Sequence, residues 1–134
     1  MDIITTSMET TIAGLANESI LPVGETLYAT GNAISSNGNS IILQQPGKYA
    51  IAATFTIEPS AADFLTVIAM INGLVITDAN ASICAKGTIM LPMIFNVGSS
   101  IPGSEISFRL ETTEKDTSVK LFSVSVDVVM ISCG

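Results

Sequence analysis

Hydrophobic residues recur at every second position from Leu21 onward, and this period of two restricts the possible folds more than any other feature of the chain. The pattern is clear over residues 49–57 and recurs over 106–111 and 122–130. Successive side chains of a β-strand point to opposite faces of its sheet, so each run predicts a strand with one buried face. An amphipathic helix would instead show a period near 3.6.

Turn signals separate these runs and keep the predicted strands short. Pro46-Gly47 precedes the run at 49–57, and Asn72-Gly73 lies between Ile71 and Leu74, which is a strong hairpin signal. Roughly eight to ten strands with no core helix predict an all-β fold. We expect a two-sheet antiparallel sandwich, with the jelly roll as the leading version.

Two stretches, 64–71 and 89–95, are apolar at both alternating sets of positions. A strand of this kind has both faces buried, whereas a sandwich covers only one of them. A neighbouring subunit would supply the second cover, and a loop or the N-terminal segment is the alternative. Pro92 interrupts the second stretch and predicts an edge strand or a bulge there. The candidate subunit interface consists of Phe64, Ile68 and Met70, together with Val129 and Ile131 of the last predicted strand.

The low content of charged residues agrees with surface that is hidden in an oligomer. Charged residues make up 13% of the chain, about half of what an ordinary soluble domain carries.

The first twenty residues differ in pattern from the rest. They are rich in threonine, a poor helix former, and their apolar residues fall at loosely helical spacing. We expect residues 1–20 to form an arm that becomes ordered against a partner, and 21–134 to form the jelly roll. The candidate docking residues of the arm are Ile4, Met8, Ile12 and Leu15.

The segment Ser40–Ile51 resembles the strand–turn–strand element of trimeric jelly rolls related to tumour necrosis factor and the complement globular heads. Ile71–Ile76 is similar to the apolar-Asn-Gly-apolar hairpin of the same domains. The resemblance covers about residues 20–134 and is closest to bacterial and phage versions, whose openings Ile3–Met8 also resembles. It implies a homotrimer in which the inner sheet packs about a threefold axis. Unlike the spore-surface glycoproteins of this group, the chain has no Gly-X-Y stalk.

Residues suited to catalysis or metal binding are few. The chain has no histidine and no tryptophan, which removes the usual general base and the best sugar-stacking side chain. The carboxylates that could act in pairs or bind Ca²⁺ are Glu58 with Asp63, and Glu111 with Glu114 and Asp116. We expect them to be solvated surface, and we expect no enzyme activity, no catalytic residue, no cofactor and no metal.

The two cysteines, Cys84 and Cys133, are too few for a structural zinc site. We expect them to be buried small hydrophobic residues. A disulfide between them remains an alternative.

Charge and hydropathy exclude two classes of partner. The net charge is −7, whereas nucleic-acid binding needs a basic surface. The longest apolar stretches are far shorter than the ~20 residues of a membrane-spanning helix. The N-terminus has no basic segment followed by an apolar one, so we expect no secretory signal and folding in the cytoplasm.

These expectations lead to a non-enzymatic bacteriophage virion structural protein. It would be a trimeric head-decoration or fibre-like protein that attaches through its N-terminal arm to a capsid or other virion protein. The alternative is a receptor- or glycan-binding adhesin tip of a tail or cell surface. The sequence does not distinguish between capsid, tail and baseplate.

Overall fold

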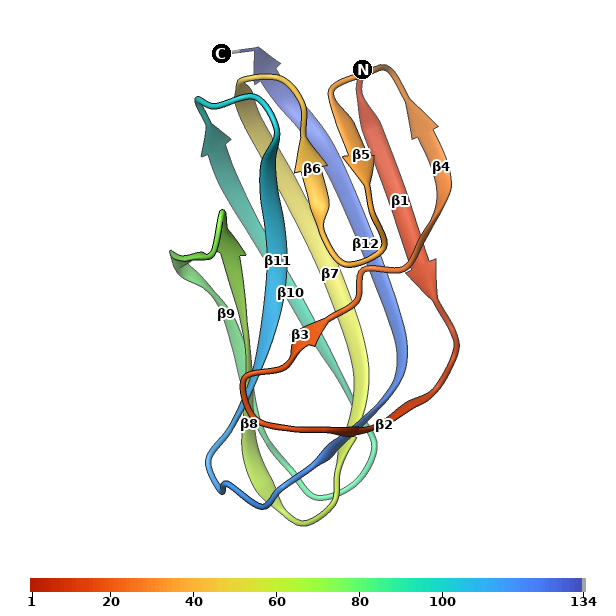
Figure 1. Ribbon diagram of the computed structural model, residues 1–134, viewed down its shortest axis with the longest axis vertical. Coiled ribbons are helices and arrows are strands. Elements are labelled where there is room, and N and C mark those ends of the chain that lie inside the picture. The colour runs from red at the N-terminus through yellow and green to blue at the C-terminus, as the bar shows by residue number, and fades with distance from the viewer. Residues whose placement is uncertain (134) are drawn as a thin grey trace.

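Twelve β-strands build two antiparallel sheets in the computed structural model, which describes residues 1–133 (Figure 1). Sheet A contains β1 (Ile3–Met8), β2 (Ile12–Leu15), β4 (Glu25–Thr30), β7 (Gly47–Pro59), β10 (Ile89–Ser99) and β12 (Val119–Cys133). Sheet B contains β3 (Ile20–Leu21), β5 (Ile34–Ser36), β6 (Ile41–Leu43), β8 (Asp63–Ile71), β9 (Leu74–Ala85) and β11 (Ser104–Thr112). The strand order is β10-β7-β12-β1-β4 in sheet A, with β2 beside β12, and β5-β6-β11-β8-β9 in sheet B, with β3 beside β11. The predicted all-β, two-sheet antiparallel sandwich is confirmed.

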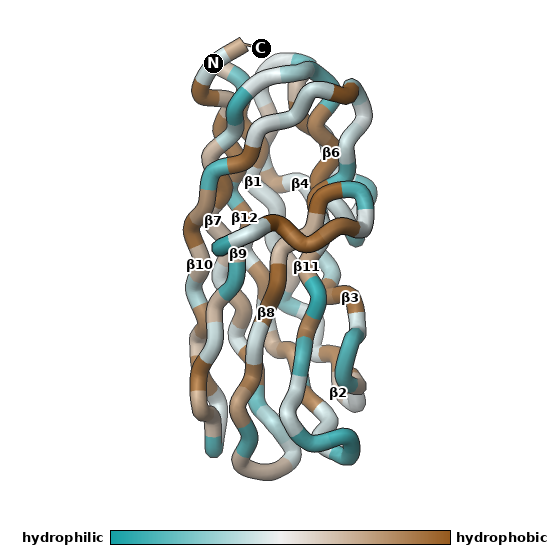
Figure 2. The backbone as a smooth tube through the Cα atoms, turned by 90° about the vertical axis from the view of Figure 1, so that its left-hand side faces the viewer, coloured by the Kyte–Doolittle hydropathy of each residue, from teal (hydrophilic) through white to brown (hydrophobic). Residues whose placement is uncertain are grey.

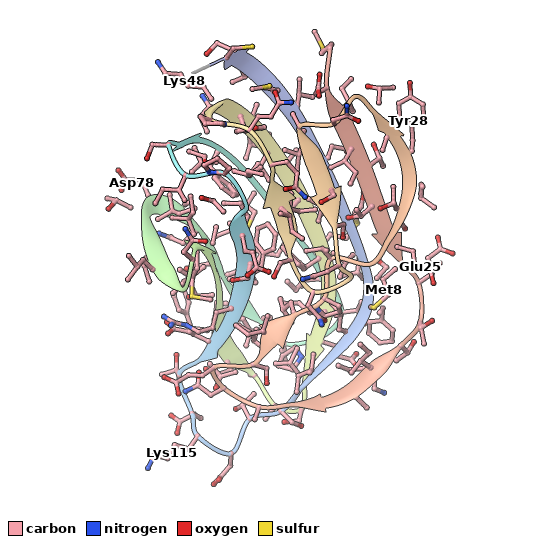
Figure 3. All side chains as sticks on the ribbon, turned by 45° about the horizontal axis from the view of Figure 1, so that its top comes forward. Met8, Glu25, Tyr28, Lys48, Asp78 and Lys115 are labelled. Carbon is pink, nitrogen blue, oxygen red and sulfur yellow. The ribbon has the colours of Figure 1, made fainter. Side chains whose placement is uncertain are left out.

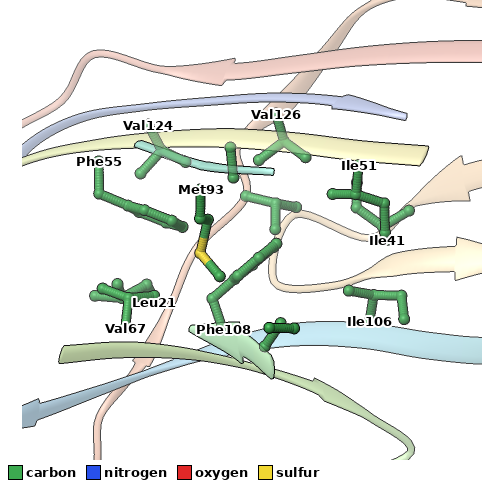
Figure 4. Packing of buried hydrophobic residues seen from close by; sticks show 14 of the residues in the cluster. Leu21, Ile41, Ile51, Phe55, Val67, Met93, Ile106, Phe108, Val124 and Val126 are labelled. Carbon is green, nitrogen blue, oxygen red and sulfur yellow. The ribbon is translucent and has the colours of Figure 1, made fainter. Parts of the chain in front are cut away.

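The core lies between the two sheets, where their inward-facing side chains meet (Figure 4). Strand β7 shows why the sequence folds this way, since its odd-numbered residues from Gly47 to Pro59 are all buried and none of the others is. Phe108 of β11 connects the two sheets, because its ring packs edge-on against the rings of Phe55 and Phe95 in sheet A. The distances between ring centroids are 5.3 Å and 6.3 Å. Such aromatic pairs add to the hydrophobic gain of burial.

The segment predicted as an arm is instead part of the sandwich. Strand β1 lies between β12 and β4, and Ile4 pairs with Val128 and is only 1% exposed. Met8, Ile12 and Leu15 are partly buried against the same core. Residues 3–8 are therefore a strand of the sandwich and not a free arm. Ile4 is buried, whereas Met8, Ile12 and Leu15 keep part of their surface exposed, and docking through them stays a prediction.

Local signals in the sequence have the expected structural effects. Asn72 and Gly73 have φ angles of 50° and 80°, and positive φ at both central residues of a two-residue turn gives the type I′ hairpin between β8 and β9. Pro92 lies on β10, an edge strand of sheet A, as predicted. In β12 a bulge between Leu121 and Ser123 places Leu121 in the core, so Phe122 does not continue the inward row.

The strands β1 and β12 bring the two ends of the described chain to one end of the sandwich (Figure 1). The N–H of Met130 donates to the carbonyl oxygen of Asp2 at 3.0 Å. Within residues 1–133, no helix has the length and hydrophobicity needed to cross a membrane.

Candidate subunit interface

The outward face of sheet A has small side chains at its centre. Along β7 the central outward residues, between Lys48 and Glu58, are two alanines followed by two threonines, and all four are half-buried between their neighbours. Outward residues that pair across β1, β12, β7 and β10 form four rows, each running across the strands in that order. The two rows nearer the chain ends are Ile3, Val129, Ala50 and Asn96, and Thr5, Asp127, Ala52 and Ile94. The next two rows are Ser7, Ser125, Thr54 and Pro92, and Ser123, Thr56 and Met90, the last of which has no residue from β1.

Large apolar side chains border this face. Ile94 and Met90 on β10 are 83% and 67% exposed, and Tyr28 on β4 is 57% exposed. Figure 3 shows Tyr28 pointing away from the sandwich at the β4 edge. Strand β10 itself runs along the side of the sandwich next to β9, the edge strand of sheet B (Figure 2). On β10 the exposed residues Met90, Pro92 and Ile94 form one apolar row, while Tyr28 lies at the opposite edge of sheet A. Rows of exposed apolar groups mark surfaces that bind a partner.

The face carries little charge, so burying it would desolvate few ions. Strand β10 has no charged residue, and β7 has none between Lys48 and Glu58. Among the four rows the one charged side chain is Asp127, whose Oδ1 accepts a hydrogen bond of 2.7 Å from Thr5 Oγ1. Burying a hydrogen-bonded carboxylate costs less free energy than burying an unpaired one.

The structure divides the five predicted interface residues between two sheets. Val129 lies half-buried on the outward face of sheet A, and Ile131 is exposed near the end of β12. Phe64 and Ile68 belong to sheet B, where Phe64 is 51% exposed, and Met70 is buried. The five therefore do not form one patch, because the sequence pattern specifies alternation but not the sheet to which each strand belongs.

Sequence reasoning missed Met90 and Ile94, although the signal for them was present. Leu91, Met93 and Phe95 occupy the alternate positions and fill the core. Met90 and Ile94 alternate with these core residues in the stretch 89–95, so their side chains point to the other face of the strand, away from the core.

The acidic residue Asp63 has a structural role at the other end of the sandwich. Its Oδ1 accepts N–H groups from Phe64 at 2.6 Å and Thr113 at 3.2 Å, and its Oδ2 accepts the N–H of Glu114 at 3.1 Å. Desolvation raises the pKa of Asp63, but these hydrogen bonds outweigh it and lower the pKa below its usual value. Asp63 therefore anchors the loop between β11 and β12.

The other groups considered for chemistry are separated from one another. Glu58 accepts a hydrogen bond from Thr88 Oγ1 at 3.0 Å, and Glu111 pairs with Arg109 at 3.1 Å. Across residues 1–133, no three His, Cys, Asp or Glu side chains are placed to hold a metal ion. Cys84 and Cys133 are both exposed and unbonded, which corrects the expectation that they are buried.

Comparison with known proteins identifies the fold but no sequence relative. No family model and no curated protein matches the sequence. The chain is similar in structure to murine APRIL, with a TM-score of 0.66 and 8% identity over 96% of this chain and 98% of that one. The globular domain of zebrafish complement 1qA gives a TM-score of 0.63 and 9% identity over the whole of both chains. Vertex protein P5 of phage PRD1 gives 0.59 and 12% identity over 97% of this chain and 96% of that one. The chain therefore has the jelly-roll fold of the tumour necrosis factor and complement-head domains, as the resemblance implied.

Proposed function

We propose that the chain is a non-enzymatic structural protein of a bacteriophage particle, in which it forms a homotrimer through the outward face of sheet A. Its likeness in fold to a phage vertex protein supports the virion role. The resemblance to trimeric jelly rolls, found in the sequence, supports the number of subunits. Localisation on the virion and attachment to a capsid or other virion protein are part of the same proposal.

The observation that carries the proposal is the exposed apolar border of a face with small, mostly uncharged residues. Covering a large apolar side chain such as Ile94 or Met90 contributes up to ~1.5–3 kcal/mol. The border and the centre of the face are different surfaces, so the contact between two copies joins unlike patches. Head-to-tail contacts of this kind close into rings when the rotation permits, and a threefold ring satisfies every copy.

Attachment through a free N-terminal arm is not part of this proposal, because residues 3–8 are a strand inside sheet A. The trimer would contact the virion through surfaces that the subunits leave exposed. The outward face of sheet B is one of them, with exposed Phe64 and Val75, and exposed Leu74 lies next to it at the turn between β8 and β9. Three copies of even a weak contact would attach firmly, since the second and third contacts form at high effective concentration.

Two measurements test the proposal. Light scattering during gel filtration should give a mass near three times the 13.9 kDa of the chain. Antibodies against the chain should label purified phage particles from a lysate of the host strain that encodes it. A stable monomer would overturn the trimer, and protein confined to the particle-free fraction would overturn the virion role.

One observation favours the alternative of a glycan-binding tip. Two turns that are far apart in sequence, which contain Asn37 and Asn72, meet at Glu105. Its side-chain Oε1 accepts a hydrogen bond from Asn37 Nδ2 at 3.3 Å, and its backbone N–H donates to Asn72 Oδ1 at 2.9 Å. Such a fixed, amide-rich corner suits hydrogen bonding to sugar hydroxyls. Reproducible binding on a glycan array that Asn37→Ala and Asn72→Ala abolish would favour this function over a purely structural one.

A further inference from the structure

The outward face of sheet A changes in chemical character halfway along its length. In the half nearer the chain ends, the three central strands carry four apolar residues together with the hydrogen-bonded pair of Thr5 and Asp127. These apolar residues are Ile3, Val129, Ala50 and Ala52. In the next two rows, farther from the chain ends, every outward residue of the same strands is a hydroxyl: Ser7, Ser125, Ser123, Thr54 and Thr56. We call these two parts the apolar half and the hydroxyl half. Beyond the hydroxyl half lies the charged pair Glu58 and Lys120.

The hydroxyl half contains a groove. Its volume is about 410 Å³, and its lining includes all five hydroxyl residues. Met90 and Glu9 also contribute to the lining, so one charged side chain borders the groove.

The five hydroxyls depend on water for their hydrogen bonds. Within the described part of the chain, none of them makes a side-chain hydrogen bond to another protein group, although the apolar half has one between Thr5 and Asp127. Burying a hydroxyl without a new hydrogen-bond partner is unfavourable, because the hydroxyl loses its hydrogen bonds to water. A dry contact over five of them would oppose association, whereas covering Ala50, Ala52 and Val129 would favour it.

We propose that a second copy of this chain packs against the apolar half only, and that the hydroxyl half stays open to water inside the assembly. This inference rests on the trimer of the proposed function and specifies its contact surface. Ile94, on the edge strand next to Ala52, is 83% exposed. It has the size to pack over the alanines of a neighbouring copy, as large residues interdigitate with small ones in packed interfaces.

A cysteine scan along β7 tests this directly, because its four central outward residues cross from one half to the other. The variants are Ala50→Cys, Ala52→Cys, Thr54→Cys and Thr56→Cys, each in a Cys84→Ser, Cys133→Ser background, since both native thiols are exposed. A hydrophilic maleimide should modify the assembled Ala50→Cys and Ala52→Cys proteins about tenfold more slowly than the two threonine-derived variants. All four should react alike after unfolding in denaturant.

The outcomes separate this inference from the proposed function. Equal labelling at all four positions in a protein with trimeric mass would overturn the division into halves and leave the trimer intact. Slower labelling at Thr54→Cys and Thr56→Cys would do the same. A monomeric mass for the unmodified protein would overturn both.

Charged variants give a second readout that does not depend on thiol reactivity. Ala50→Lys should convert the assembly to monomers, because it places an ammonium in a dry contact beside the uncharged Val129 and Asn96. Thr56→Lys, on the same face of β7 but in the hydroxyl half, should keep the mass of the unmodified protein. Circular dichroism should show that both variants retain the β-sheet spectrum, and dissociation by Thr56→Lys with retention by Ala50→Lys would overturn the proposal.

Discussion

The close approach of two backbone segments at Gly24 shows how strictly single positions are specified. Its φ is +91°, and a Cβ placed there would lie 2.3 Å from the carbonyl oxygen of Ser7 and 2.8 Å from the backbone nitrogen of Met8. Backbone atoms cannot rotate away as a side chain would, so Gly24→Ala must push the connection before β4 off β1. We expect a loss of about 1–3 kcal/mol in the free energy of unfolding, measured by urea titration. Gly38→Ala is the matched control, since its φ is +92° but no atom lies within 4 Å of the added carbon. An equal loss in both variants would show that φ, not the contact with β1, is responsible.

The carboxylate of Asp63 makes stability depend on pH. Its folded-state pKa is lowered, so its contribution to stability is present above the unfolded-state pKa of about 3.9 and is lost as the pH falls through the folded-state value. Asp63→Asn presents only one good acceptor to the three N–H donors and should unfold at lower urea concentration at pH 7. The difference from the unmodified protein should narrow below about pH 4. A difference that is constant between pH 7 and pH 3 would contradict this.

At the scale of elements, β1 stabilises the fold through its place between β12 and β4. Two consecutive residues of β1, Ile3 and Ile4, point in opposite directions. Ile4 points into the core and Ile3 lies on the outward face of sheet A. Ile4→Ala should therefore lower the free energy of unfolding by about 2–5 kcal/mol, whereas Ile3→Ala should cost far less in the monomer. Urea unfolding at low protein concentration measures both. Similar small losses would mean that β1 behaves as the loosely held arm expected from the sequence.

The strands with strong alternation, β7 and β11, could be predicted from the sequence, and β1 could not. One of its inward positions is Thr6, which is fully buried and donates its Oγ1 hydrogen to the carbonyl oxygen of Val23 at 2.7 Å. A buried threonine reads as polar, so the period of two disappears from Ile3–Met8. Ile4, Met8, Ile12 and Leu15 then show a helical spacing that arises by coincidence, because they lie on two strands separated by a bend.

Part of the candidate subunit interface could be predicted from the sequence, again from the alternation of residues along a strand. The two-sided stretch 89–95 correctly indicated a strand with an exposed apolar face, and Met90 and Ile94 are exposed there. Local alternation specifies which residues share a face of one strand. It does not specify that β8 and β10 belong to different sheets, so Phe64 and Val129 were assigned to one surface although they lie on two.

At the scale of the whole molecule, the net charge of −7 opposes the self-association that the apolar half favours. Three copies would carry three times −7, or −21. The face of sheet A that we propose as the contact has little charge of its own, so this repulsion acts over longer distances and salt should screen it. We therefore expect the trimer to dissociate more readily in about 0.01 M salt, where the Debye length is about 30 Å, than in about 1 M salt, where it is about 3 Å. Sedimentation equilibrium across this range gives the association constant, and Glu105→Gln, which removes one charge on sheet B, should reduce its dependence on salt. If salt instead weakens the trimer, pairs of opposite charge hold the subunits together, and the contact lies elsewhere than on the apolar half of sheet A.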